Sequence, residues 1–160
     1  MIKLIALLLT ITIANANIFP FLLPDEGSHF DHHLQTHLKN AQKEVVIITA
    51  SMHYPSLNKT ILRSLSHGVH LSIIANDLHN DPLHFAAYQN VAVYRNSTRA
   101  ISDTIILIDN THICHIPDAL DEKNLKNNIS NIWCSDESAL ILSSQKGINL
   151  LKKRSTPYLE

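Results

Sequence analysis

Residues 102–109 read Ser-Asp-Thr-Ile-Ile-Leu-Ile-Asp, and this stretch decides the fold class. Its middle is a run of four apolar residues, from Ile105 to Ile108, which is typical of a central strand covered on both faces of its sheet. Asp109 follows directly, at a place where a carboxylate usually accepts hydrogen bonds from a turn or from backbone amides. The stretch therefore predicts an α/β fold in which helices cover both sides of a sheet.

The chain before this strand has the pattern of a strand, a helix and a second strand. Residues 45–50 and 69–75 form apolar runs, and the segment between them, from Pro55, carries leucines and isoleucines at helical spacing. Gly68 follows the last helical turn, where a glycine commonly ends a helix. We expect the two strands to lie parallel, joined by a right-handed crossover.

The rest of the chain is expected to continue the same single domain. Apolar residues at helical spacing predict an amphipathic helix over 29–43, and residues 20–27 are expected to form an extended loop. The other expected elements are a short helix at 83–88, strands at 91–94, 111–116 and 129–134, and a final helix capped by Ser135 or Asp136. No internal repeat or linker divides the sequence.

The first residues have the three parts of a secretory signal peptide. Lys3 gives a positive start, residues 4–14 are apolar, and Ala14-Asn15-Ala16 has the small-x-small pattern of a cleavage site. The apolar run is too short for a membrane-spanning helix, which needs about 20 residues. We therefore expect a signal peptide at 1–16, a single domain at 17–160 without a transmembrane segment, and a secreted or periplasmic location.

The charge balance argues against strong nonspecific DNA binding. The chain has 13 Lys and Arg against 14 Asp and Glu, which gives a net charge of −1 with neutral His. Nonspecific affinity for DNA comes from basic side chains that displace counterions. The basic run at 152–154 is better explained as the positively charged end of a helix. The balance weighs against a nuclease, and binding of nucleic acid or phospholipid stays open.

The sequence contains two cysteines, Cys114 and Cys134. Each falls in an expected strand, and both would meet an oxidising compartment after export. Either they form a disulfide with one another, or they remain as two buried free thiols.

Two long segments and the order of the elements resemble the phospholipase D superfamily, especially its small, secreted, single-motif, endonuclease-like branch. The first segment, residues 43–77, is similar to the opening strand, helix, turn and second strand of the family. The second, residues 101–133, can be laid without a gap on its catalytic strand and the segment after it. The resemblance runs from about Leu23 to Leu151 and implies a mixed sheet flanked by helices on both faces.

The resemblance also implies where an H-x-K-x-x-x-x-D motif would lie, and here the motif is degenerate. In active members a His attacks phosphorus, a Lys and an Asn bind the nonbridging oxygens, and no metal or other cofactor is needed. At the position of the nucleophilic His this sequence has Ser102, and at the position of the Lys it has Thr104. Ile116-Pro117 replaces a Gly-Ser pair, Ala119 replaces the Asn, and Ser130 replaces a Glu that orients the His. Asp109 is retained.

These replacements favour a catalytically inactive homologue that acts as a binding or partner subunit. Active single-motif relatives build their site across a two-fold dimer, so the resemblance implies a homodimer or a heterodimer with an active relative. The alternative is an active phosphodiesterase, a nuclease or a phospholipase D-like hydrolase, with a rearranged site. That alternative needs a histidine close to Ser102, and the candidates are His53, His112 and His115.

A second alternative is a periplasmic metal-binding protein, because the chain has 11 histidines. His29, His33 and His37 recur every four residues on the first expected helix, a spacing that can hold zinc or another divalent ion. Two further groups are Asp77, His79, Asp81 and His84 in a loop, and His112 and His115 on either side of Cys114. None of these groups has a known metal-site signature, so ordinary surface histidines remain the other explanation.

Overall fold

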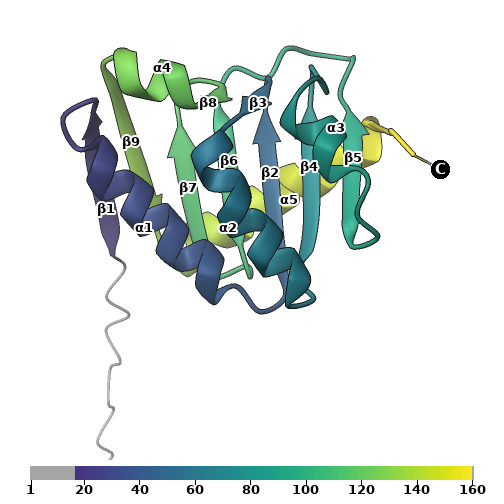
Figure 1. The fold of residues 1–160 in the computed structure, drawn as a ribbon, viewed down its shortest axis with the longest axis horizontal. Coiled ribbons are helices and arrows are strands. Elements are labelled where there is room, and N and C mark those ends of the chain that lie inside the picture. Colours follow the sequence, from purple (N-terminus) through teal and green to yellow (C-terminus); the bar gives the residue numbers. More distant parts are fainter. Residues whose placement is uncertain (1–16, 160) are drawn as a thin grey trace, which may run out of the picture.

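The computed structural model describes residues 17–159, and the expected signal peptide at 1–16 lies outside the described residues. An eight-stranded mixed sheet forms the centre of the molecule, in the order β1-β9-β7-β6-β2-β4-β5-β10 (Figure 1). Its strands are β1 (Ile18–Leu23), β2 (Glu44–Thr49), β4 (His70–Ala75), β5 (Val91–Arg95), β6 (Thr104–Ile108), β7 (His112–Ile116), β9 (Ser130–Ser135) and β10 (Thr156–Pro157). A separate two-stranded sheet pairs β3 (Met52–His53) with β8 (Leu120–Asp121).

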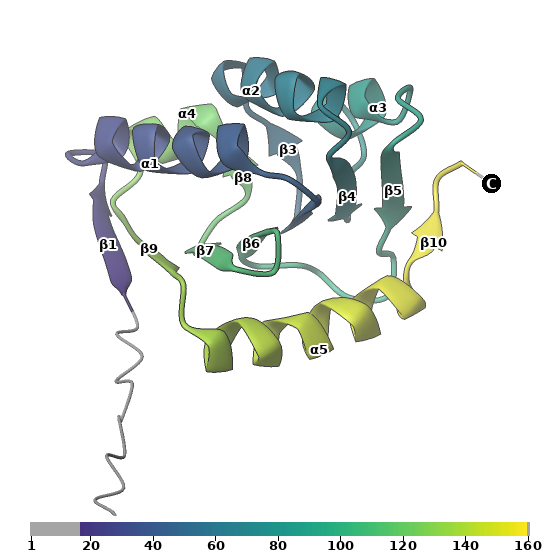
Figure 2. The same ribbon diagram turned by 90° about the horizontal axis from the view of Figure 1, so that it is seen from below.

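Helices cover both faces of the large sheet, as the resemblance implies. Figure 2 shows α5 on one face and the other helices on the opposite face. The helices are α1 (Gly27–Asn40), α2 (Pro55–Ser66), α3 (Asp81–Phe85), α4 (Glu122–Asn127) and α5 (Ser138–Arg154). None of the helices among residues 17–159 is long and apolar enough to cross a membrane.

The predicted central strand, β6, lies in the middle of the sheet and is buried on both faces. Ile106 and Ile108 pack into the core under α1 and α2, while Leu107 packs into a smaller core under α5. β6 pairs antiparallel with both β2 and β7, and β2 pairs parallel with β4 as expected. Gly68 has φ of +88° after α2, so it ends that helix in the left-handed conformation.

The first described segment differs from the expectation. Residues 20–27 were expected to form a loop, but Ile18–Leu23 is an edge strand that pairs antiparallel with β9. Pro20 indicates a loop because it lacks an amide hydrogen, yet an edge strand tolerates proline. Phe21 and Leu23 are buried on the α1 side, and this burial at alternate positions defines the strand.

Candidate functional site

Five of the six motif positions lie together at one end of the sheet. β6 begins at Thr104 and β9 begins at Ser130, while β7, which is antiparallel to both, ends between them. Ser102 comes just before β6, and Pro117 and Ala119 come just after β7. This is the upper end in Figure 1, near β8 and α4. We call these five residues and their surroundings the motif end.

Thr104 stands where the resemblance places a phosphate-binding lysine, and it is completely buried. Its Oγ1 donates to the carbonyl oxygen of Asp118 at 2.7 Å and lies 2.8 Å from Oγ1 of Thr49, which is also buried. Oγ1 of Thr49 accepts from the backbone N–H of Leu120 at 2.9 Å. The two hydroxyl groups thus tie β2 and β6 to the segment after β7, and Thr104 offers no polar atom to a ligand.

The positions after β7 carry no group that binds or activates a phosphate. Pro117 is exposed but has neither a backbone N–H nor a polar side chain, and Ala119 has a methyl group where an amide is expected. Oγ of Ser130 is buried and has no hydrogen-bond partner. A serine is also too short to orient a distant imidazole as a glutamate would.

Ser102 lies beside an Asp–His pair that is not part of the family motif. Nε2 of His115 is 3.1 Å from Oδ2 of Asp103, and hydrogen bonds from His115 and then from Ser102 hold the pKa of Asp103 below its usual range. The indole of Trp133 stacks on His115 with 5.1 Å between ring centroids. Nδ1 of His115 is buried without a hydrogen-bond partner. Among the histidines expected near Ser102, His115 is therefore the one that shares a partner with it.

The order of these groups differs from that of a nucleophilic triad. In such a triad the imidazole lies between the hydroxyl and the carboxylate, so that it can remove the hydroxyl proton. Here the carboxylate of Asp103 lies between Ser102 and His115. The lowered pKa of Asp103 makes its carboxylate a weaker base than an ordinary aspartate.

A groove of about 440 Å³ opens beside Ser102, between the start of β6 and α5. Its lining is mostly apolar and consists of Ile48, Ala100, Ile101, Ser102, Asp103, Ile105, Ser144, Gly147, Ile148 and Leu151. The one charged group among these residues is the carboxylate of Asp103. Binding sites for phosphate present positive groups or backbone N–H donors, so this lining suits an apolar partner better than an anion.

Asp109, which the resemblance assigns to the last position of the motif, lies at the opposite end of β6 and has a structural role. Its Oδ2 accepts from the backbone N–H of Gln42 at 2.7 Å, and its Oδ1 accepts from those of Lys43 and Glu44 at 2.8 and 2.9 Å. Asp109 and Asn110 both have positive φ, 52° and 57°, in the turn between β6 and β7. The carboxylate therefore fixes this turn to the start of β2, as its position after an apolar strand predicts.

The histidines of α1 do not gather as their spacing alone would suggest. His29 is exposed, whereas His33 and His37 face His112, which is buried at the start of β7. Nε2 of His33 lies 3.0 Å from Nε2 of His112, and the ring of His37 stacks on that of His112 at 3.6 Å. Burial first, and then the neighbouring imidazoles, lower the pKa of His33 to about 4 and that of His112 to about 3. Burial also lowers the pKa of His37. The three rings are therefore neutral at pH 7.

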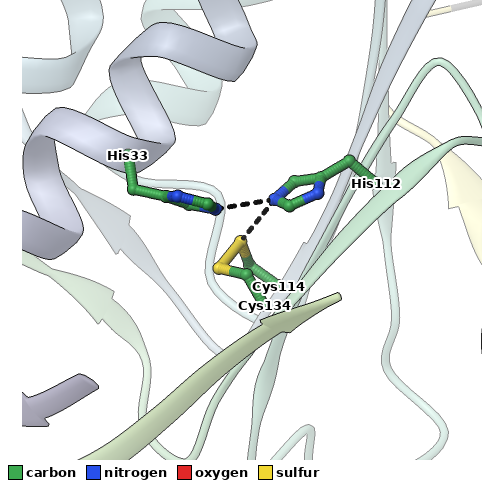
Figure 3. A group of neighbouring side chains, drawn as sticks. All are labelled: His33, His112, Cys114 and Cys134. Atoms are coloured by element: carbon green, nitrogen blue, oxygen red, sulfur yellow. Dashed lines mark hydrogen bonds between the residues drawn. A yellow bond between two sulfur atoms is a disulfide. The ribbon is translucent and has the colours of Figure 1, made fainter. Parts of the chain in front are cut away.

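Cys114 and Cys134 form a disulfide next to this histidine pair, so the first of the two cysteine alternatives holds. They are direct partners on β7 and β9, and both are completely buried. Figure 3 shows His33 and His112 pointing toward one another above the two sulfur atoms. The ligand atoms of these four residues all lie within 4.8 Å of one another. We call His33, His112, Cys114 and Cys134 the His-Cys cluster.

The remaining expected histidine groups are dispersed. His79 bonds to Asp77 on the surface, and His53 lies 3.8 Å from Asp81. Asp81 is buried, and it accepts a hydrogen bond from the backbone N–H of Tyr54. Asp77 lies in a loop, whereas Asp81 and His84 belong to α3, so the group expected in one loop is divided between two elements and separate contacts.

Solved structures with the same arrangement of strands and helices are found among phospholipase D proteins. NucT from Helicobacter pylori matches with a TM-score of 0.80 at 16% sequence identity, over 89% of this chain and 99% of that one. Nuc from Salmonella typhimurium, a phospholipase D family member, matches with a TM-score of 0.76 at 13% identity, over 91% and 99%. The chain has the phospholipase D fold.

Larger proteins contain this fold as one part. A phosphatidylserine synthase from Haemophilus influenzae matches over 89% of this chain but 40% of its own, with a TM-score of 0.70 and 16% identity. No protein-family model and no curated protein sequence matches the chain. The fold is therefore shared with proteins whose sequences are only 13–16% identical to this one.

Proposed function

We propose that this chain is an exported phospholipase D-like protein that does not hydrolyse phosphodiesters and acts as a binding or partner subunit. The observation that supports this best is Thr104, which is completely buried and hydrogen-bonded to Asp118 and Thr49. Thr104 therefore offers no positive charge to a phosphate group at the motif end. Transition-state stabilisation by fixed positive groups is usually the largest contribution to such catalysis, so its loss removes the activity.

The nucleophile is missing as well. The hydroxyl of Ser102 meets the weakly basic carboxylate of Asp103 and no imidazole, so nothing takes up its proton. The Asp103–His115 pair is nevertheless the one feature that favours the alternative, an active phosphodiesterase with a rearranged site. Hydrolysis assays separate the two hypotheses.

The mature chain, residues 17–160, is incubated with bis(p-nitrophenyl) phosphate and with single- and double-stranded DNA, with and without EDTA. We expect no hydrolysis above the background of buffer in the wild type or in Ser102→Ala. Ser143→Ala, an exposed position on α5, is the matched control. Activity that survives EDTA, persists in Ser143→Ala and disappears in Ser102→Ala would overturn the proposal and make Ser102 a nucleophile.

The apolar groove supports the second half of the proposal, a partner subunit. Ile101, which precedes β6, and Leu151 of α5 line this groove. Leu142 and Leu150, also on α5, are exposed. Apolar surface that is left in water favours association with another protein. We propose that the partner is a second copy of this chain or an active relative, and that export follows from residues 1–16.

Sedimentation of the mature chain tests the homodimer. We expect a concentration-dependent dimer that Ile101→Glu weakens by about tenfold, because it puts a charge into apolar contact. Leu83→Glu, an exposed apolar position on α3, is the control and leaves association unchanged. A wild type that stays monomeric at high concentration would contradict the homodimer, and copurification with an active relative would then test the heterodimer.

A further inference from the structure

The His-Cys cluster joins four potential metal ligands from three elements. His33 comes from α1, His112 and Cys114 from β7, and Cys134 from β9. His112, Cys114 and Cys134 are completely or almost completely buried, whereas His33 is half-buried and is the member of the cluster that solvent reaches. A set of two imidazoles and two thiolates is a common ligand set for structural zinc.

The present distances are close to those of a tetrahedral zinc site. Zn–N bonds of about 2.0 Å and Zn–S bonds of about 2.3 Å place neighbouring ligand atoms about 3.3 Å apart for two nitrogens and about 3.6 Å apart for nitrogen and sulfur. In the structure the two Nε2 atoms of His33 and His112 are 3.0 Å apart, and Nε2 of His112 is 3.7 Å from Sγ of Cys114. Shifts of a few tenths of an ångström at these atoms would satisfy the geometry.

The two sulfur atoms are the exception, because they are bonded to one another. A disulfide sulfur carries no negative charge and is a poor ligand, whereas a thiolate binds zinc strongly. Reduction would free both side chains to turn about their χ1 angles, while β7 and β9 hold their backbones side by side. We propose that reduction of the Cys114–Cys134 disulfide converts the His-Cys cluster into a zinc-binding site.

The chemistry balances with a dithiol as the reductant. The dithiol gives two electrons and two protons to the protein disulfide and itself becomes a disulfide, which leaves two protein thiols. Zinc then displaces both protons and bonds to the two thiolates and to two neutral imidazoles. The two negative charges of the thiolates balance the zinc ion, so the filled site is neutral, which suits its burial.

His37, which packs on His112 but lies outside the His-Cys cluster, provides a matched control. Its ring stacks on His112 at 3.6 Å with an angle of 2° between the planes, so its face, and not a nitrogen, is turned toward His112. The group of ligand atoms that lie within 4.8 Å of one another includes neither His37 nor His29. The proposed site therefore uses His33 and His112 as its imidazole ligands. It differs from a site formed by His29, His33 and His37, which their spacing on α1 alone would predict.

Cobalt(II) titration of the mature chain tests the proposal, because cobalt replaces zinc and reports its ligands by colour. The protein is compared in its oxidised form and after reduction with a phosphine under anaerobic conditions. We expect the reduced chain to bind one cobalt ion, with a thiolate-to-cobalt charge-transfer band and the visible bands of tetrahedral cobalt, and zinc to abolish both. We expect the oxidised chain to show no charge-transfer band and to bind zinc at least about 100-fold more weakly.

The variants locate the site. Cys114→Ser/Cys134→Ser should lose the charge-transfer band, and His33→Gln should weaken binding at least about tenfold, while His37→Gln should bind like the wild type within about threefold. Near-ultraviolet circular dichroism follows folding throughout. A reduced chain that is folded and shows no charge-transfer band overturns the proposal, and so does one that unfolds and is not refolded by zinc. Equal affinity in both redox states, or no effect of His33→Gln, would place the metal elsewhere and also overturn it.

Discussion

Replacing Asp109 with asparagine should destabilise the fold by about 3 kcal/mol and leave the motif end unchanged. The carboxylate accepts three backbone hydrogen bonds, from Gln42, Lys43 and Glu44, at 2.7 to 2.9 Å. In Asp109→Asn one carboxylate oxygen becomes an NH₂ group that faces a backbone N–H donor, so at least one hydrogen bond is lost. The remaining hydrogen bonds are weaker because their acceptor is a neutral amide oxygen and no longer a charged carboxylate. Hydrogen bonds to charged groups contribute about 1.5–3 kcal/mol each, and neutral ones about 1 kcal/mol. Asparagine tolerates the positive φ of 52° at this position, so the backbone adds little to the loss.

Guanidinium unfolding at pH 7 gives the free energy of unfolding for the wild type and the variant. Asp25→Asn, an exposed carboxylate in the turn before α1, is the control, and we expect it to change stability by less than about 0.5 kcal/mol. Asp109→Ala removes all three bonds and should lose about 5 kcal/mol or more. If Asp109→Asn is as stable as Asp25→Asn, the three bonds do not stabilise the fold, and the structural role assigned to the retained motif residue is wrong.

Three further predictions concern buried groups: the hydroxyl of Thr104, the His33–His112 pair and the Cys114–Cys134 disulfide. Thr104→Val keeps the shape of the side chain but removes its two hydrogen bonds, so guanidinium unfolding should show a loss of about 2 kcal/mol. His33 and His112 have pKa values of about 6.5 in the unfolded chain but about 4 and about 3 in the folded protein. As the pH falls below 6.5, the unfolded chain therefore takes up protons that the folded protein does not, and the free energy of unfolding decreases. Between pH 7.5 and 5 these pKa values alone correspond to a loss of about 4 kcal/mol for the pair, but His33 is half-exposed and solvent screens its interactions, so we expect about 2–3 kcal/mol, and about half as much in His112→Asn. Reduction of the Cys114–Cys134 disulfide, which spans 20 residues, should lower the unfolding midpoint by the equivalent of about 3 kcal/mol in the absence of metal.

The large elements of the fold could be predicted from local patterns. β2, β4 and β6 are apolar runs that require cover on both faces, and α1 and α2 carry apolar residues at helical spacing. The strands β3, β8 and β10 have two residues each, so no periodicity marks them, and pairing with distant segments alone defines them. Tertiary pairing also makes Ile18–Leu23 a strand in spite of its proline.

The two sites differ in how far the sequence reveals them. The hairpin of β6 and β7 pairs Ile105 with His115, and Asp103 lies on the same face two residues before Ile105, so the Asp103–His115 contact follows from the register. His33 and His112 are 79 residues apart and lie on a helix and a strand, so no spacing rule connects them. Their meeting depends on how α1 crosses the sheet, which is a property of the packed structure.

The buried hydrogen bonds of Thr104 belong to a connected set, so the single substitution Thr104→Lys would not create a phosphate site. Thr104 is bonded to Thr49 and to the carbonyl of Asp118, and Thr49 is bonded to the backbone of Leu120, so the segment after β7 rests on two neutral hydroxyls. A lysine at position 104 would leave these partners without their bonds and would place a charge in a fully buried position. An unpaired buried charge costs several kcal/mol, whereas the neutral network satisfies its own polar groups. The two hydroxyl groups and their partners therefore stabilise this end of the sheet together, and a lysine at position 104 would disrupt all of these bonds at once.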